Sequence, residues 1–140
     1  MFGDDDKGRL ENMVTAVCYS PVFYLALSFV LSSFKVHSTV NLRMLSNIML
    51  CASLAAVLLS RVLHMLLVPA ESTPTPKRIA ATCLLLAWIG EAISMCGAVI
   101  VWMGAQLMWC APFLIISGLY LIDFRVFRLP EIISRWPGNK

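Results

Sequence analysis

The chain of 140 residues is rich in apolar side chains and poor in charge, with 59% hydrophobic and 14% charged residues. A soluble domain carries about 25% charged and about 45–50% apolar residues, so this composition excludes an ordinary soluble domain. The net charge of +3 is too small and too scattered to indicate a nucleic-acid partner. At this length we expect one domain, residues 1–140, whose main surroundings are a lipid bilayer.

The first half of the chain contains two apolar segments. The first, about residues 13–34, has no charge and is long enough to cross a hydrocarbon core about 30 Å thick. Pro21 lies inside it and predicts a kink, because proline removes one helical hydrogen bond. The second segment, about residues 44–68, is interrupted by Arg61 and His64. His64 is more typical of an interfacial residue than of a ligand.

The second half contains a long stretch, residues 79–122, in which Glu91 is the only charge. As one helix it would rise about 66 Å, roughly twice the thickness of the hydrocarbon core, so it must fold back. Gly104-Ala105-Gln106 is the predicted reversal, because glycine tolerates the backbone angles of a tight turn. Two further spans follow, about 79–103 and 107–124.

The lysine and arginine residues predict the orientation. With four antiparallel spans, both termini and the middle loop share one side of the membrane. That side carries Lys7, Arg9, Lys77, Arg78, Arg125, Arg128, Arg135 and Lys140. The other side has Lys35 and Arg43 alone, so both termini should be cytoplasmic. The predicted fold is an all-α, integral membrane four-helix antiparallel bundle. Its first span should be retained, because Asp4, Asp5 and Asp6 are unlike the positive start of a secretory signal.

Two segments outside the spans have a recognisable pattern. Residues 69–76 contain three prolines and predict an extended, solvated loop. Near the C-terminus, Pro130 suits the first turn of a helix. Ile132, Ile133 and Trp136 would then share one side, opposite Glu131 and Arg135. This predicts a short helix on the cytoplasmic membrane surface, with a frayed tail as the equally open alternative.

Catalytic and metal-binding motifs are not found in the sequence. The five cysteines lie within the predicted spans, without the spacing of a zinc site, and are best read as packing residues: Cys18, Cys51, Cys83, Cys96 and Cys110. No nucleophile–base arrangement, phosphate-cradling glycine loop or paired carboxylate motif is present. We therefore expect no enzyme activity, no metal and no cofactor.

The third span has one face of small residues. At about 100° per residue, small side chains gather on an arc of about 100°, and bulky ones occupy the rest of the helix. The small face carries Ala80, Cys83, Ala87, Gly90, Ser94 and Ala98, with Glu91 at its edge; the bulky side carries Leu85, Leu86, Trp88, Ile89, Ile93, Ile100 and Met103. Small residues four apart permit close helix packing in lipid. The second span offers the same spacing in Ala52, Ala56 and Ser60, so these two spans are predicted to pack as a hairpin.

Glu91 is the candidate ion or proton site. An ionised carboxylate at that depth costs at least about 2.5–3.5 kcal/mol, which protonation or a partner would relieve. Arg61 is one predicted partner, although its depth differs from that of Glu91 by about 8 Å. Tyr24 lies at nearly the same depth as Glu91 and is predicted to donate a hydrogen bond. Glu91 is either a neutral structural acid or a functional proton or ion site, and the sequence leaves both alternatives open.

The ten residues from Glu91 to Ile100 read Glu-Ala-Ile-Ser-Met-Cys-Gly-Ala-Val-Ile. This run resembles the carboxylate-bearing helix of rotary ATP synthase c subunits, in which the glutamate carries the translocated ion. The preceding helix uses alanine and serine where a c subunit uses glycine, and a further span follows the glutamate helix. The whole chain also resembles small four-span bacterial membrane proteins of unknown function, which implies the bacterial inner membrane.

Two functions follow from these patterns. In the first, the chain is a non-catalytic assembly or accessory component that packs through the small face of the third span, with copies of itself or with another membrane protein. In the second, it translocates protons or ions through Glu91.

Overall fold

The computed structural model describes residues 4–34, 36, 39–67 and 75–134, and the regular elements in this part of the chain are helices. Their bounds are α1 (Asp4–Cys18), α2 (Ser20–Leu31), α3 (Leu42–Leu67), α4 (Pro76–Trp102), the short 3-10 helix η1 (Leu107–Cys110), α5 (Ala111–Asp123), the π-helical segment η2 (Phe124–Arg128) and α6 (Leu129–Ser134). Four helical stretches are long and apolar enough to cross a membrane: Lys7–Leu31, Leu42–Leu66, Pro76–Trp102 and Leu107–Ser134. The prediction of four such helices is confirmed.

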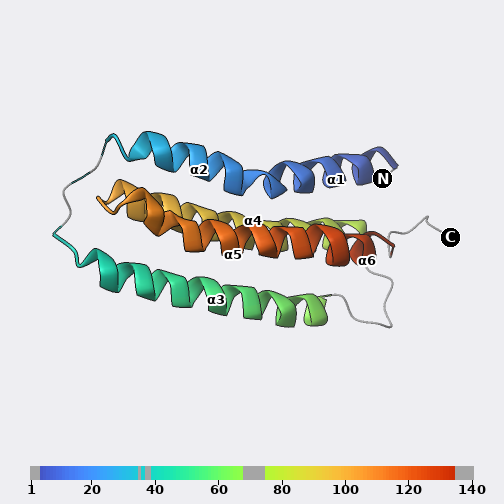
Figure 1. The fold of residues 1–140 in the computed structure, drawn as a ribbon. Coiled ribbons are helices and arrows are strands. Elements are labelled where there is room, and N and C mark those ends of the chain that lie inside the picture. The colour runs from blue at the N-terminus through green and yellow to red at the C-terminus, as the bar shows by residue number, and fades with distance from the viewer. Residues whose placement is uncertain (1–3, 35, 37–38, 68–74, 135–140) are drawn as a thin grey trace.

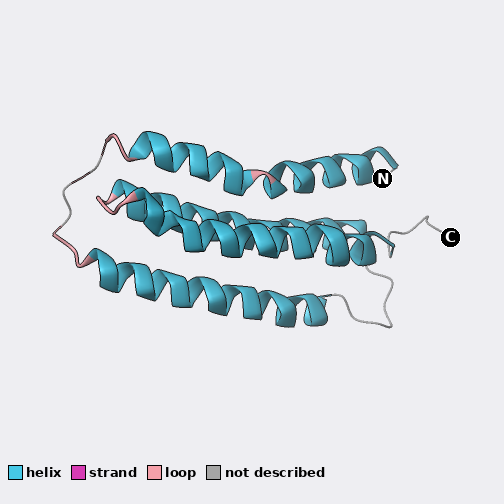
Figure 2. Ribbon diagram, in the orientation of Figure 1, coloured by secondary structure: helices cyan, strands magenta, loops and turns pink. Residues whose placement is uncertain are grey.

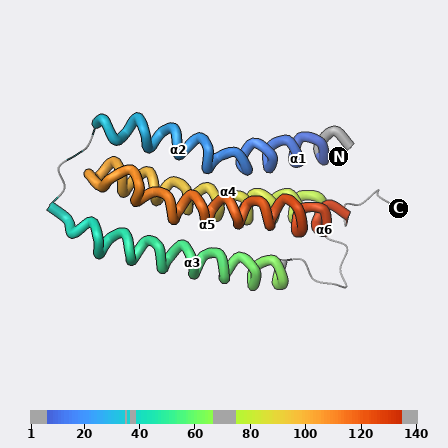
Figure 3. Tube along the Cα trace, viewed as in Figure 1, coloured from blue at the N-terminus to red at the C-terminus, as the bar shows by residue number. Residues whose placement is uncertain are grey.

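Successive stretches run antiparallel to each other (Figure 1). α4 and α5 lie side by side in the middle of the bundle, with α1 and α2 on one side and α3 on the other (Figure 3). The start of α1 and the end of α6 are at the same end of the bundle, where α3 ends and α4 begins. Loops are found at the two ends, apart from one break in the first stretch (Figure 2).

That break separates α1 from α2 at Tyr19, two residues before Pro21. Pro21 therefore lies in the first turn of α2, where its missing N–H costs little. The apolar stretch begins at Lys7 and ends at Leu31, about six residues earlier at its start than the predicted span 13–34. The difference arises because the helix already begins at Asp4, before the start of the predicted apolar span.

The predicted reversal between the third and fourth spans is confirmed. Gly104 has a φ of +110°, a backbone conformation that favours glycine. Its N–H donates to the Val101 carbonyl at 3.0 Å, and the Ala105 N–H donates to the Ile100 carbonyl at 3.2 Å. η1 then leads into α5, with Pro112 in the first turn of that helix. The chain thus turns within a few residues, and α5 returns directly along α4.

α4 is the central helix, because half of its apolar stretch is buried, against 11% of the stretch in α3. Its exposed bulky side chains form one stripe at helical spacing, Leu85, Trp88, Met95 and Trp102. Three residues of the predicted bulky side are instead buried: Leu86, Ile93 and Ile100. Other helices surround α4 on most of its circumference, so both small and bulky side chains of α4 are buried. The predicted division into a small packing face and a bulky outer face is therefore too simple.

The last stretch is longer than the predicted span 107–124. α5 continues through η2 into α6, and Ile132 and Ile133 of α6 join a buried cluster with Val14 of α1 and Ile79 of α4. The predicted C-terminal helix therefore packs inside the bundle rather than on a membrane surface. Trp136 and Arg135 lie outside the described residues, as does most of the predicted loop 69–76.

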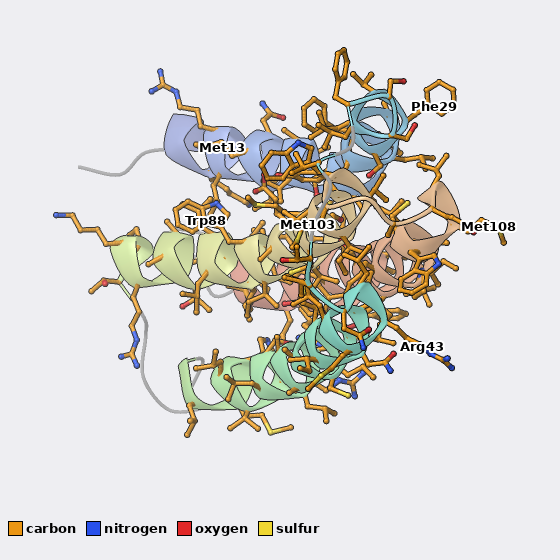
Figure 4. All side chains as sticks on the ribbon, turned by 90° about the vertical axis from the view of Figure 1, so that its left-hand side faces the viewer. Met13, Phe29, Arg43, Trp88, Met103 and Met108 are labelled. Carbon is orange, nitrogen blue, oxygen red and sulfur yellow. The ribbon has the colours of Figure 1, made fainter. Side chains whose placement is uncertain are left out.

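The outer surface of the bundle is apolar. Phe29, Trp88 and Met108 extend outwards from three different helices (Figure 4) and are between 63% and 80% exposed. Large apolar side chains so exposed on every side are unfavourable in water but suit a lipid bilayer. The arrangement is that of an integral membrane protein.

Candidate functional site

Glu91 lies in the middle of α4, about 22 Å from its Pro76 end and about 17 Å from its Trp102 end. Its side chain is half-buried at the edge of the helix, between the buried Ser94 and the exposed Trp88. The hydroxyl of Tyr24 in α2 lies 3.5 Å from Glu91 Oε1. Hydroxyl–oxygen hydrogen bonds are ordinarily about 2.5–3.0 Å long, so this contact is long. The structure brings Tyr24 and Glu91 together and leaves the carboxylate partly open at the bundle surface.

Arg61 lies elsewhere. It is exposed on α3 and shares a cleft with Tyr120, Asp123 and Arg128 of the last helical stretch. Among the described residues, no ion pair joins it to Glu91. α4 and α5 lie in the middle of the bundle, so α2 with Tyr24 and α3 with Arg61 approach Glu91's helix from different sides. The structure thus separates Arg61 from the Glu91–Tyr24 pair.

The small face of α4 is filled by this chain's own helices. Ala87, Gly90, Ser94 and Ala98 are all buried. A Cβ placed on Gly90 would lie 2.6 Å from Leu121 Cδ2 and 3.0 Å from Tyr120 Cδ1, both in α5. The close partner of this face at Gly90 is therefore α5 and not the second span, which corrects the predicted mate of the small face, while α3 also packs against α4. The short Gly104 turn explains the choice, because it brings α5 directly back along α4.

The three small residues of α3 lie in different surroundings: Ala52 is exposed, Ala56 is half-buried and Ser60 is buried. The Ser60 hydroxyl donates to the Val57 carbonyl at 2.6 Å and accepts a hydrogen bond from Arg128 Nη1 at 3.2 Å. Through the second of these hydrogen bonds, Ser60 connects α3 to the guanidinium group of Arg128. Ala52, Ala56 and Ser60 therefore do not form one continuous seam of small residues.

Sequence reasoning missed that charged group. Arg128 is 8% exposed, and its Nη2 lies 2.9 Å from Asp123 Oδ2. The guanidinium also lies over the Tyr120 ring, 5.5 Å from its centre. Tyr120 in turn donates to the Leu86 carbonyl of α4 at 2.8 Å. A polar cluster of Ser60, Tyr120, Asp123 and Arg128 therefore links α3, α4 and α5.

The π-helical segment η2 makes this cluster possible. Five-residue spacing places two side chains about 140° apart on an α-helix. In a π turn the hydrogen bonds run from residue i to residue i+5, so the turn is wider and side chains five apart lie on one side. Asp123 immediately precedes η2 and Arg128 ends it. In the sequence, the pair is indicated only by the opposite charges of Asp123 and Arg128. Their five-residue spacing does not favour an ion pair on an α-helix.

Two open clefts of ≈250 Å³ and ≈330 Å³ lie beside this cluster. Both are lined by Arg61, Asp123 and Arg128. One extends past His64 towards the end of the bundle, and the other extends past Val57 and Ile116 towards its middle. His64 Nε2 is buried without a hydrogen-bond partner and lies 3.9 Å from Glu131 Oε2.

The described part of the chain contains no group of three or more histidine, cysteine or acidic residues that could hold a metal ion. All five cysteines are free thiols. Cys83 and Cys110 are buried and Cys51 is exposed on the apolar surface of α3.

No family model, curated protein or solved structure matches this chain.

Proposed function

We propose that this chain is a small multi-pass membrane protein without catalytic activity that serves as an assembly component, and that it contacts its partner on the side of α2 and α4 around Glu91. The observation that carries the proposal is the half-buried carboxyl group of Glu91 in the middle of α4, with one long contact to Tyr24. A carboxylate open to lipid at that depth costs at least about 2.5–3.5 kcal/mol. A polar group from another helix would relieve that cost.

The predicted assembly surface, the small face of α4, is not available for this role because α5 covers it. The surface around Glu91 remains open, and its neighbours Trp88, Ala92 and Met95 are exposed. The partner is a second copy of the chain or another membrane protein. We further propose that the bundle end that holds Lys7, Lys77 and Arg78 faces the cytoplasm, because it carries the excess of lysine and arginine. The resemblance to small bacterial membrane proteins supports the bacterial inner membrane as the location.

Photo-crosslinking tests this proposal. A benzophenone amino acid is placed at Ala92, which is exposed next to Glu91, and at Ala55, which is equally small and exposed in the middle of α3. We expect a protein adduct from position 92 and adducts with lipid alone from position 55. Protein adducts of equal yield at both positions would contradict the proposed surface, as would their absence at position 92.

A second function is kept because the open carboxyl group also suits proton or ion handling, and because residues 91–100 resemble the carboxylate helix of ATP synthase c subunits. In this case, a hydrophobic carbodiimide should label wild-type Glu91. A carboxyl group covered by a partner in an assembly should react poorly. Peptide mass spectrometry distinguishes the two, with Glu91→Gln as the unlabelled control.

A further inference from the structure

The two clefts beside Arg128 together form one groove with a polar end and an apolar end. Its polar end lies near the end of the bundle where α3 and α6 finish. This end is lined by Arg61, His64, Asp123 and Arg128, together with the apolar side chains of Met65 and Phe127. The second cleft shares Arg61, Asp123 and Arg128 with the first and extends past Tyr120 to an apolar end at Val57, Ile116 and Leu119. Ile116 and Arg128 are separated by about 18 Å along the helix axis. The groove thus changes from charged to apolar in the same direction as a phospholipid changes from headgroup to acyl chain.

The charge in the polar end favours an anion. Arg128 and Asp123 form an ion pair and largely cancel each other's charge. Arg61 has no ion-pair partner among the described residues, and it is exposed in both clefts. Glu131 lies 3.9 Å from His64 but does not line either cleft. Among the described residues, Arg61 is therefore the cation in the lining that is left without a counter-ion. A guanidinium group binds phosphate oxygens through two parallel hydrogen bonds, which suits it to a phosphate headgroup.

The position of the groove supports the same ligand. It opens on the outside of the bundle between α3 and α5, which neighbour each other in Figure 1. Arg61 lies six residues before the end of α3, about 9 Å from the end of that helix. Its long side chain reaches outwards from this depth to the headgroup region. Basic pockets between membrane helices on the cytoplasmic side bind anionic lipid headgroups.

We infer that this groove binds an anionic phospholipid, with its phosphate at Arg61 and one acyl chain along Val57, Ile116 and Leu119. Arg128 shapes the polar end while held by Asp123, Ser60 and Tyr120. The inference rests on the membrane location and not on the role of Glu91.

Native mass spectrometry of the full chain in a mild detergent tests this inference, with phosphatidylglycerol and phosphatidylcholine titrated separately. We expect the wild type to bind phosphatidylglycerol more tightly. Arg61→Gln should weaken phosphatidylglycerol binding about fivefold, the effect of one basic residue near an anionic lipid, and leave phosphatidylcholine binding unchanged. Because Arg61 is exposed, the variant should keep its helical circular dichroism spectrum.

Arg78→Gln is the matched control, because Arg78 is an exposed arginine in the first turn of α4 at the same end of the bundle but outside the groove. An equal loss in this variant would show that diffuse charge binds the lipid and would overturn the inference. An unchanged affinity in Arg61→Gln would also overturn it.

Inorganic phosphate at millimolar concentration should fail to displace phosphatidylglycerol. If it displaces the lipid, a free anion is the ligand and the lipid assignment is wrong. Crosslinking from position 92 should be unaffected by Arg61→Gln, so the two proposals fail separately.

Discussion

Ser94 of α4 and Ser117 of α5 are hydrogen-bonded to each other at 2.7 Å in the middle of the buried seam between these helices. The Ser117 hydroxyl donates in turn to the Gly90 carbonyl at 2.6 Å. Both hydroxyl groups are fully buried, and each has a partner. The seam is therefore held by a short polar chain at the point where Gly90 allows the closest approach of the two helices.

The serine pair should contribute a small, measurable coupling. Ser117→Ala removes a hydroxyl group from Gly90 and Ser94, but Ser94 then turns to donate to a carbonyl of its own helix. We expect a loss of about 1 kcal/mol in the free energy of unfolding for Ser117→Ala. The cycle of Ser94→Ala and Ser117→Ala should give a coupling energy of about 0.6 kcal/mol, the mean for membrane-helix hydrogen bonds. Unfolding in mixed micelles measures both, and strictly additive effects would argue against the bond.

Gly90 should tolerate no larger side chain. A Cβ at this position meets Leu121, which is 1% exposed and has little room to move. Gly90→Leu should therefore cost several kcal/mol and separate α4 from α5. The control is Ala81→Leu, nine residues earlier on the exposed side of the same helix and away from Glu91. Thermal stability in detergent compares the two. Equal stability would mean that the seam does not lie where the structure places it.

Breaking the Asp123–Arg128 pair should destabilise the fold. Asp123→Asn leaves the guanidinium of the buried residue Arg128 without its carboxylate. Removing one member of a buried pair costs about 3–5 kcal/mol, and the 35% exposure of the Asp123 side chain reduces this to about 1–3 kcal/mol. The double variant Asp123→Asn, Arg128→Gln should recover part of the loss. Urea or detergent unfolding measures the recovery, which should be missing if the pair does not form.

The positions of basic residues predict which ends of the bundle face which side of the membrane. Lys7 and Lys77 lie at one end, with the start of α1 and of α4, and Gln106 lies in the turn at the other end. Cysteines introduced at these sites into a cysteine-free background should react with a membrane-impermeant maleimide from opposite sides. Labelling of positions 77 and 106 from the same side would rule out the four-span arrangement.

The sequence predicts the four spans and the Gly104 turn because these depend on local properties, namely hydropathy, length and the backbone freedom of one glycine. It does not predict that α5 is the partner of the small face. Small residues recur in α3 and in α4, and spacing alone does not distinguish two helices that could both pack there. The length of the connecting turn was the deciding information, since the Gly104 turn leaves α5 little choice of neighbour.

The Asp123–Arg128 pair is hidden from sequence reasoning for two reasons. Charged residues mark the end of a span in a hydropathy argument, and so the predicted span ends at residue 124, within the cluster. The π-helical segment η2 then brings Asp123 and Arg128 to the same side of the helix. No local sequence pattern predicts a π-helical segment at this position. The Glu91–Tyr24 contact can be predicted from the sequence because it depends on the two residues lying at the same depth in the membrane. That depth follows from counting residues from the ends of the spans.

The central claim is that the side of the bundle around Glu91 binds a partner within the membrane. Its most direct test is native mass spectrometry of complexes extracted in a polymer-bounded lipid disc, for the wild type and for Glu91→Ala. We predict a wild-type complex heavier than one chain of 15.5 kDa and a single chain for Glu91→Ala, with the same helical circular dichroism spectrum. A wild-type protein that is a single chain, or a complex that Glu91→Ala leaves intact, would contradict the claim.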